Sequence, residues 1–169
     1  MTKVKINLLH SKQTLQFKEG LNIFIAPNGC GKTLLGKVLS GAIKDNRVKH
    51  SFKNNFIYIN CLTDILIADD TIKNIIKKDF NLKEPLCSQD VFESDGLMRL
   101  AYIIDKVINT KEDLYIDLPE TCLHINLQGY FIDYLKEHIG SRTIIVTTHS
   151  PYIINGEFDL YVDKNVELN

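Results

Sequence analysis

Residues 23–35 read IFIAPNGCGKTLL and decide the fold class of this 169-residue chain. The apolar run at 21–25 predicts a buried strand, and the apolar spacing after residue 33 predicts a helix. Gly29 and Gly31 can adopt backbone angles closed to other residues, and they let the main chain approach an anion. The amides from residue 29 to residue 33 then converge at a helix N-terminus, where the helix dipole favours negative charge. The stretch therefore predicts a phosphate-binding loop composed of Asn28, Gly29, Cys30, Gly31, Lys32, Thr33 and Leu34.

Two side chains of this loop have direct chemical roles. Lys32 is expected to reach the β and γ phosphates of a nucleotide, and the hydroxyl of Thr33 is expected to ligate Mg²⁺. The match to G-x-x-x-x-G-K-[ST] departs at its first position, which is Ala26. Alanine adds one methyl group and is tolerated where the backbone angle φ stays negative. Cys30 is interpreted as a small residue that fits the loop, in preference to a reactive thiol. ATP and Mg²⁺ are thus the expected cofactors.

Composition restricts the class of protein. The chain is 44% hydrophobic and 24% charged, with a net charge of -1, which predicts one globular domain over residues 1–169 without a global basic field for nucleic acid. The sequence has no signal-peptide pattern and no apolar run near the roughly 18 residues of a membrane span, so no membrane partner is expected. The cysteines at 30, 61, 87 and 122 form no Cys-x-x-Cys pair. They predict reduced thiols in a cytoplasm and argue against zinc.

The rest of the chain alternates between strand and helix patterns. An α/β fold is predicted, with a mostly parallel sheet flanked by helices on both faces, an N-terminal antiparallel hairpin entering that sheet, and a small helical lobe at about 62–95. Residues 44–55 are polar and basic, and are interpreted as a solvated loop that is also the candidate basic patch for nucleic acid. The expected strands are 3–9, 13–17, 21–25, 56–60, 113–117, 143–147 and one within 158–168. The expected helices are 32–43, one or two within 62–78, 94–109 and 125–139, with a loop at 81–90. The helix at 94–109 is expected to bury Leu97, Leu100, Ala101, Ile103, Ile104 and Val107, and the apolar stripe of the helix at 125–139 consists of Leu127, Tyr130, Phe131, Tyr134 and Leu135.

A second motif follows downstream. Residues 113–117 form an apolar strand that ends in Asp117, whose carboxylate could hold the Mg²⁺ shell opposite Thr33. Residues 118–124 read LPETCLH, and residues 147–151 read TTHSP after another apolar strand. With the Asn-Gly-x-Gly-Lys loop, these segments resemble the ATPase heads of the ABC-type superfamily, and their pattern is most similar to the SMC/OLD-like branch. The resemblance extends from residue 21 to about residue 154.

This resemblance implies roles for several residues. His149 matches the switch histidine that contacts the γ-phosphate, although it could also be a buried histidine at a strand end. Residues 93–96 are similar to the family signature, in which Ser94 and Gly96 would touch a nucleotide bound by the opposite subunit. Ser94 could instead be a plain helix cap. The implied partner is therefore a second head, in a homodimer or a heterodimer.

The sequence departs from the family pattern at two positions. The family's catalytic glutamate directly follows the aspartate, and this position holds Leu118, which cannot orient or deprotonate a water molecule. Glu120 matches the family's second glutamate and is a secondary catalytic candidate. The family's metal-lining glutamine is replaced by Asn60, which is shorter by one methylene group.

The function expected from the resemblance is that of a stand-alone ATPase head that dimerises around Mg-ATP and drives a separate effector protein. Family context suggests DNA repair, recombination or anti-phage defence, with any contact to nucleic acid being indirect. One alternative is a nucleotide-binding regulatory subunit with impaired hydrolysis, which Leu118 supports. Another is a small P-loop kinase, which would normally use several arginines to clamp phosphates. The chain offers only Arg47, Arg99 and Arg142.

Overall fold

The structure is a computed structural model that describes residues 2–8, 11–82, 94–154 and 160–161. Its central sheet has five parallel strands, in the order β5 (Ile57–Asn60), β6 (Leu114–Asp117), β7 (Thr143–Thr148), β3 (Gly20–Ile25) and β8 (Leu160–Tyr161). A second, antiparallel sheet has the order β2 (Ser11–Phe17), β1 (Thr2–Leu8) and β4 (Val48–His50).

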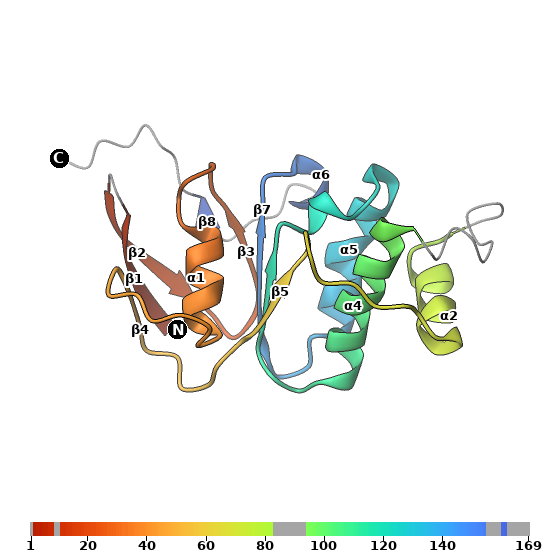
Figure 1. Cartoon of the computed structure of the whole chain (residues 1–169), viewed down its shortest axis with the longest axis horizontal. Coiled ribbons are helices and arrows are strands. Elements are labelled where there is room, and N and C mark those ends of the chain that lie inside the picture. The colour runs from red at the N-terminus through yellow and green to blue at the C-terminus, as the bar shows by residue number, and fades with distance from the viewer. Residues whose placement is uncertain (1, 9–10, 83–93, 155–159, 162–169) are drawn as a thin grey trace.

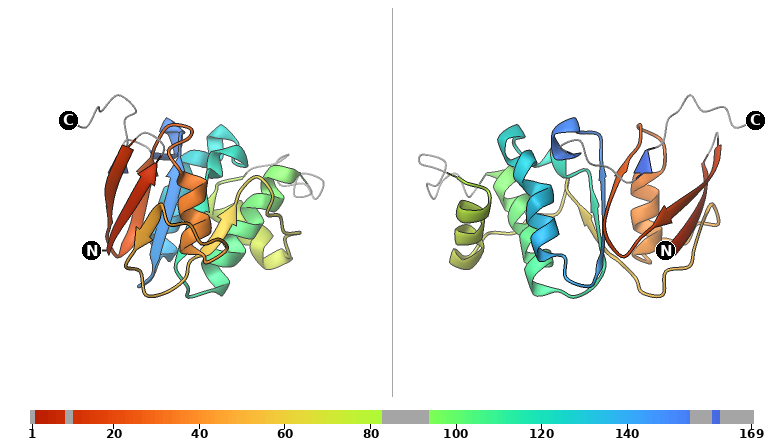
Figure 2. Two further views of the ribbon diagram at one scale, coloured as in Figure 1. Left: turned by 60° about the vertical axis from the view of Figure 1, so that its left-hand side comes forward. Right: turned by 180° about the vertical axis from the view of Figure 1, so that it is seen from behind.

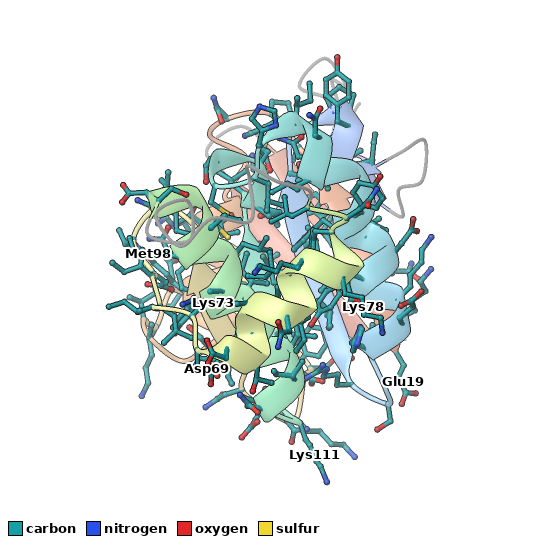
Figure 3. The ribbon with its side chains drawn as sticks, turned by 90° about the vertical axis from the view of Figure 1, so that its right-hand side faces the viewer. Glu19, Asp69, Lys73, Lys78, Met98 and Lys111 are labelled. Atoms are coloured by element: carbon teal, nitrogen blue, oxygen red, sulfur yellow. The ribbon has the colours of Figure 1, made fainter. Side chains whose placement is uncertain are left out.

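The helices form layers on both faces of the central sheet (Figure 1). Helix α1 (Lys32–Leu39) lies between the two sheets, and helices α4 (Asp95–Asn109) and α5 (Ile125–His138) cover the opposite face. The views in Figure 2 show the same order of layers. Helix α2 (Asp70–Asp79) is outermost and lies across α4 and α5, as seen in Figure 3. Two short helices, η1 (Pro119–Thr121) and α6 (Pro151–Ile154), follow strands β6 and β7.

Side-chain alternation along the central strands creates two hydrophobic cores. Phe24, Tyr115 and Ile145 pack with α1 and the antiparallel sheet, whereas their strand neighbours Ile116 and Ile144 pack with α4 and α5. Because successive side chains of a strand point to opposite faces, a strand buried on both sides is continuously apolar. This confirms the predicted parallel α/β fold.

The long helix predicted at 94–109 is confirmed as α4. Its predicted buried face is also confirmed, because Leu97, Leu100, Ala101, Ile103, Ile104 and Val107 are all buried. Helix α5 ends at His138, close to its predicted end, but Tyr130 is 42% exposed although it was expected on the buried stripe.

Helix α1 is shorter than predicted. It ends at Leu39, four residues before the predicted end, because Gly41 adopts a φ of 74° that a right-handed helix cannot accommodate. The amide of Gly41 instead donates to the carbonyl of Val38 at 3.0 Å.

The solvated loop predicted at 44–55 is wrong in part. Strand β4 lies within it and pairs with β1, with Val48 opposite Ile6 and His50 opposite Val4. A single buried side chain, Val48, gives too short an apolar pattern for sequence periodicity to detect. The hairpin of β1 and β2 therefore pairs with β4 and does not enter the central sheet as predicted.

The apolar stripe predicted within 62–78 is a helix only in its second half. Helix α2 begins after Asp69, whose carboxylate accepts a hydrogen bond from the amide of Ile72 at 2.8 Å as an N-cap. Leu62, Ile65 and Ile67 precede the cap and are 57%, 51% and 80% exposed.

Some predictions fall partly or wholly outside the described residues. Strand β8 pairs with β3 and confirms a strand within 158–168, whereas the rest of that stretch lies outside the described residues. Glu93, Cys87 and most of the loop predicted at 81–90 also lie outside the described residues. Cys30, Cys61 and Cys122 are free and buried. None of the helices in the described ranges combines the length and the apolar character needed to cross a membrane.

Candidate functional site

The predicted phosphate-binding loop connects the end of β3 to the start of α1. Gly29 and Gly31 have φ angles of 82° and 79°, so both glycines use the left-handed conformation for which they were singled out. Ala26 is not among the positive-φ residues, which explains why a methyl group is accepted where the consensus has glycine. Cys30 is only 8% exposed and packs in the core beside α1, as the small-residue interpretation predicted.

The ammonium of Lys32 is held inside this loop. Lys32 is 5% exposed, and its Nζ donates to the carbonyl oxygens of Ala26 at 2.7 Å and Pro27 at 2.9 Å. Buried cations are unfavourable unless polar groups solvate them. The backbone thus holds a positive charge at the loop that carries Gly29 and Gly31, next to an eight-residue helix whose N-terminus adds further positive potential.

Asp117 connects three elements of the sheet to the loop. Its side chain is buried, with Oδ2 accepting from the hydroxyls of Thr33 at 2.7 Å and Tyr58 at 2.9 Å. Its other oxygen, Oδ1, accepts from Thr147 Oγ1 at 2.6 Å. The two candidate metal ligands, Thr33 and Asp117, are therefore in direct contact, although 84 residues separate them in the sequence.

The donor set fits Mg²⁺. Thr33 and Asp117 offer a hydroxyl and a carboxylate oxygen, which are the hard ligands that this ion prefers. Over the described ranges, no group of three or more His, Cys, Asp or Glu side chains could hold a metal by itself. A site with one carboxylate suits Mg²⁺, because this ion usually keeps several waters and binds through substrate phosphates.

Asn60 lies near this site but uses its side chain locally. It is the register partner of Asp117 at the carboxyl end of β5. Its side-chain Oδ1 accepts a hydrogen bond from the backbone amide of Leu62 at 3.1 Å, and its backbone amide donates to the carboxylate of Asp64 at 2.8 Å. The predicted metal role of Asn60 would require its side chain to leave this turn, and it stays a prediction.

His149 and Glu120 meet across the ends of two neighbouring strands. Glu120 Oε1 accepts from the backbone nitrogen of His149 at 2.6 Å, and Oε2 accepts from Thr148 Oγ1 at 2.8 Å. Partial burial and the positive charge of Lys32 lower the pKa of the His149 imidazole below its usual value of 6.5, which favours the neutral ring at pH 7. Lys32, Asp117, Glu120 and His149 thus gather at one edge of the sheet.

Leu118, where the sequence resemblance expects a catalytic glutamate, has an unusual backbone. Its φ of 55° and ψ of 58° lie in the left-handed region, which is uncommon for a residue with a branched side chain. Its amide donates to the carbonyl of Thr147 at 2.9 Å, and its carbonyl accepts from the amide of Thr121. The loop after Asp117 is therefore a tightly held turn.

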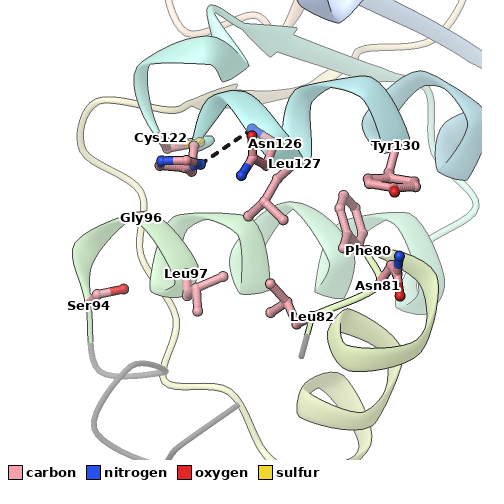
Figure 4. Close-up of a pocket in the computed structure, with 11 residues that line it drawn as sticks. Phe80, Asn81, Leu82, Ser94, Gly96, Leu97, Cys122, Asn126, Leu127 and Tyr130 are labelled. Carbon is pink, nitrogen blue, oxygen red and sulfur yellow. Dashed lines mark hydrogen bonds between the residues drawn. The ribbon is translucent and has the colours of Figure 1, made fainter. Parts of the chain in front are cut away.

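Ser94 and Gly96 lie apart from this cluster. They line a pocket of about 690 Å³ between α2, α4 and α5, together with Leu97, Leu127, Tyr130 and other residues (Figure 4). Ser94 is the N-cap residue of α4, as the alternative interpretation expected, but its side chain makes no capping hydrogen bond. A Cβ at Gly96 would meet the carbonyl oxygen of Cys122 at 2.8 Å, so close packing alone requires glycine there. Their predicted contact with a second subunit's nucleotide stays a prediction.

Sequence reasoning missed the tyrosines of the site. Tyr58 donates to Asp117, and Tyr115 donates to the backbone carbonyl of Lys32 at 2.6 Å. Both lie on the α1 face, because Tyr58 is the register partner of Tyr115 as Asn60 is of Asp117. The available signal was the period of two in both strands, which puts these tyrosines on the same face as the candidate metal ligands.

The comparisons with known proteins agree with this geometry. Residues 91–154 match an AAA ATPase domain family. No curated protein matches the chain. Among solved structures, a putative ABC transporter ATP-binding protein from Pyrococcus furiosus superposes with a TM-score of 0.63 at 14% identity, covering 96% of each chain.

Two further solved structures share the architecture. A nucleotide-free ATP-binding cassette from an ABC transporter has a TM-score of 0.58 at 15% identity, covering 94% of this chain and 86% of its own. A dimeric bacterial ABC transporter cassette has a TM-score of 0.56 at 14% identity, covering 92% of this chain and 90% of its own. The chain therefore has the P-loop α/β fold of ABC-type ATP-binding cassettes.

Proposed function

We propose that this protein binds ATP with Mg²⁺ between the loop that ends in Lys32 and Thr33 and the carboxylate of Asp117. The observation that carries the proposal is the 2.7 Å hydrogen bond between Thr33 Oγ1 and Asp117 Oδ2, which joins the two predicted motifs. Bound Mg²⁺ would be held by these two side chains and would neutralise charge on the phosphates. Lys32 would exchange its loop carbonyls for phosphate oxygens.

We further propose that two heads close on the nucleotide and transmit this closure to a separate effector. One support is the dimeric cassette among the structural neighbours. The other is the position of Ser94 and Gly96, which line a pocket that contains no residue of the phosphate-binding loop of the same chain. A homodimer or a heterodimer with another head would bring that surface to the nucleotide. Assignment to the SMC/OLD-like branch, and to DNA repair, recombination or defence, rests on the sequence resemblance alone.

Hydrolysis is expected to be slow. Leu118 cannot act as a base, and both carboxylate oxygens of Glu120 are engaged by His149 and Thr148. Loss of general-base catalysis lowers turnover by roughly 10²–10⁴-fold. This favours a switch that is read mainly through nucleotide binding, and makes the hydrolysis-impaired subunit the main alternative to an active ATPase.

The contacts made by the arginines of this protein argue against a small-molecule kinase. Arg47 pairs with Asp45 at 2.6 Å, and Arg99 Nη1 donates to the carbonyl of Cys61 at 2.9 Å. The guanidinium of Arg142 donates to four backbone carbonyls. All three arginines thus have structural partners, and a phosphate-clamping lid would need others.

The test is calorimetry with Mg-ATP on the wild-type protein and on Lys32→Ala. The wild type should release or absorb heat on association, and Lys32→Ala should bind at least about tenfold more weakly, since a charged hydrogen-bonding partner of the phosphates is lost. Light scattering with and without Mg-ATP then tests dimer closure. Equal binding by both proteins, or no binding by the wild type, would refute the proposal.

A further inference from the structure

The hydroxyl of Tyr58 lies at the metal side of the proposed site. Tyr58 is the second residue of β5, two register pairs before Asn60 and Asp117 and therefore on the same face of the sheet. Its hydroxyl donates to Asp117 Oδ2 at 2.9 Å, and Thr33 Oγ1 donates to the same oxygen at 2.7 Å. Tyr58 therefore touches the oxygen of Asp117 that faces the phosphate-binding loop.

Packing explains the ring of Tyr58 but not its hydroxyl. The ring lies beside that of Tyr115, with centroids 6.0 Å apart, and occupies the space that Gly36 leaves open on α1. A phenylalanine ring would make the same contacts. Since removing a polar group from water is unfavourable unless it gains a partner, the hydroxyl needs Asp117 in order to be accommodated there.

The contacts of Asp117 define what the hydroxyl does. Thr147 holds Oδ1 at 2.6 Å, so the carboxylate is fixed at one oxygen from β7. Tyr58 holds Oδ2 from β5, on the other side of β6 in the sheet order. When the hydroxyl oxygen of Thr33 turns toward a cation, Tyr58 remains as the donor to Oδ2. The carboxylate then keeps its orientation without reorganisation.

We propose that Tyr58 is a positioning residue that fixes Asp117 for the cation of a bound metal–nucleotide complex. The inference rests on the proposed function, because it assumes that ATP binds at this site with a divalent cation. It adds a specific requirement to that function. The hydroxyl of Tyr58 should strengthen binding of the metal–nucleotide complex and should leave binding of metal-free nucleotide unchanged.

The experiment compares ATP affinity in Mg²⁺ with ATP affinity in excess EDTA for the wild type and for Tyr58→Phe. The matched control is Tyr134→Phe, which removes the hydroxyl of a buried tyrosine that has no hydrogen-bond partner among the described residues. Tyr58→Phe should bind metal-free ATP within about twofold of wild type and should bind Mg-ATP about tenfold more weakly, as expected when a charged acceptor loses a donor. Tyr134→Phe should match the wild type in both buffers. Thermal unfolding checks that both variants fold.

A second readout avoids activity altogether. Mn²⁺, observed by electron paramagnetic resonance, replaces Mg²⁺ as the probe in the ATP complex, and Tyr58→Phe should retain less bound Mn²⁺ than either control protein. Equal losses with and without metal, unchanged affinities, or tighter Mg-ATP binding by Tyr58→Phe would each overturn the role of Tyr58. Absence of ATP binding by the wild type would instead refute the proposed function itself, and the inference with it.

Discussion

Glu120 holds the backbone of His149, with 2.6 Å between its Oε1 and the His149 nitrogen. The same carboxylate accepts from Thr148 Oγ1 at 2.8 Å, and the Thr148 hydroxyl oxygen accepts in turn from the amide of Ser150 at 2.9 Å. The loop after β6 and the loop after β7 are therefore one hydrogen-bonded unit. A glutamate with both oxygens engaged is better suited to placing His149 than to activating water.

Replacing Glu120 with glutamine should loosen this unit. The amide of Glu120→Gln is neutral and presents a donor group where the wild type has only acceptors, so the His149 N–H loses a charge-assisted bond. Amide hydrogen exchange at His149 should accelerate about tenfold or more, since hydrogen bonds to charged groups contribute about 1.5–3 kcal/mol. The measurement is exchange by nuclear magnetic resonance on the nucleotide-free protein.

The control for this variant is Glu137→Gln, the same substitution at an exposed position of α5. It should leave exchange at His149 unchanged. If Glu120→Gln exchanges like wild type, the carboxylate does not fix the histidine and its contact with His149 is incidental.

Leu118→Glu tests whether the rest of the catalytic site is complete. It restores a carboxylate directly after Asp117, where the resemblance expects a general base. ATP turnover should rise by roughly 10²-fold or more if only the base is missing. Leu118→Gln, which has a similar length without the charge, should not raise turnover. Equal rates for Leu118→Glu and wild type would mean that further parts of the site are absent.

The pH behaviour of His149 should report the charge of Lys32. Burial first, and Lys32 second, lower its pKa from 6.5, so its imidazole should titrate below pH 6.5 in the folded protein. Because the unfolded chain takes up this proton at a higher pH, the contribution of His149 makes the protein less stable as the pH falls through this range. Imidazole chemical shifts followed through a pH titration give the midpoint.

Removing the Lys32 charge should move this midpoint. Lys32→Met keeps most of the side-chain volume and should raise the pKa of His149 toward 6.5. Lys37→Met removes the same charge from an exposed position of α1 and should have little effect. A midpoint that is unchanged in Lys32→Met would show that burial alone lowers the pKa.

The fold could be predicted from the sequence wherever an apolar pattern was long enough to show a clear helical or strand period. Helix α4 was predicted to within a residue, with its whole buried face, because fifteen residues give several turns of apolar spacing. Strand β4 was missed, since a three-residue strand with one buried valine gives no periodic signal. Leu62 and Ile65 matched a helical spacing by chance, and the cap at Asp69 shows where the helix begins.

The site was predictable in its backbone motifs and not in its side-chain partners. Thr33 and Asp117 were paired as candidate metal ligands from the two motifs, and their side-chain oxygens lie 2.7 Å apart. The hydrogen bond from Tyr58 to Asp117 depends on the register between β5 and β6. In this register Tyr58 pairs with Tyr115, which is 57 residues away in the sequence, and no local pattern encodes such a pairing. Glu120 was weighed as a base from its position in the motif, whereas its engagement by His149 depends on the packing of two loops.

Arg142 should be essential for stability. Its guanidinium donates to the carbonyls of Thr110 at 2.7 Å, His138 at 2.8 Å and Ile139 at 3.1 Å, and also to Val107, so it satisfies the carboxyl ends of both α4 and α5. Arg142→Lys cannot reach these carbonyls together and should lower the free energy of unfolding by about 2–4 kcal/mol, measured by urea denaturation. Arg47→Lys, at an exposed ion pair, should leave the transition midpoint unchanged. Similar midpoints for the two variants would contradict the capping role.

Gly36 should be irreplaceable because α1 packs directly on the two tyrosines of the site. A Cβ at this position would lie 2.6 Å from ring carbons of both Tyr115 and Tyr58. Gly36→Ala must therefore displace α1 from β5 and β6, and overpacking of this kind costs about 1–3 kcal/mol.

Gly129, in α5, is the matched control, since a Cβ there meets no atom within 4 Å. Gly129→Ala should stabilise the protein by about 0.5–1 kcal/mol, because alanine loses less backbone entropy in a helix. Urea denaturation of both variants gives changes of opposite sign if this packing is correct, and Gly36→Ala should also weaken ATP binding, since the loop carbonyl of Lys32 is held by Tyr115. Equal stabilities for the two variants would mean that α1 can shift without loss and that the tyrosines do not fix the loop.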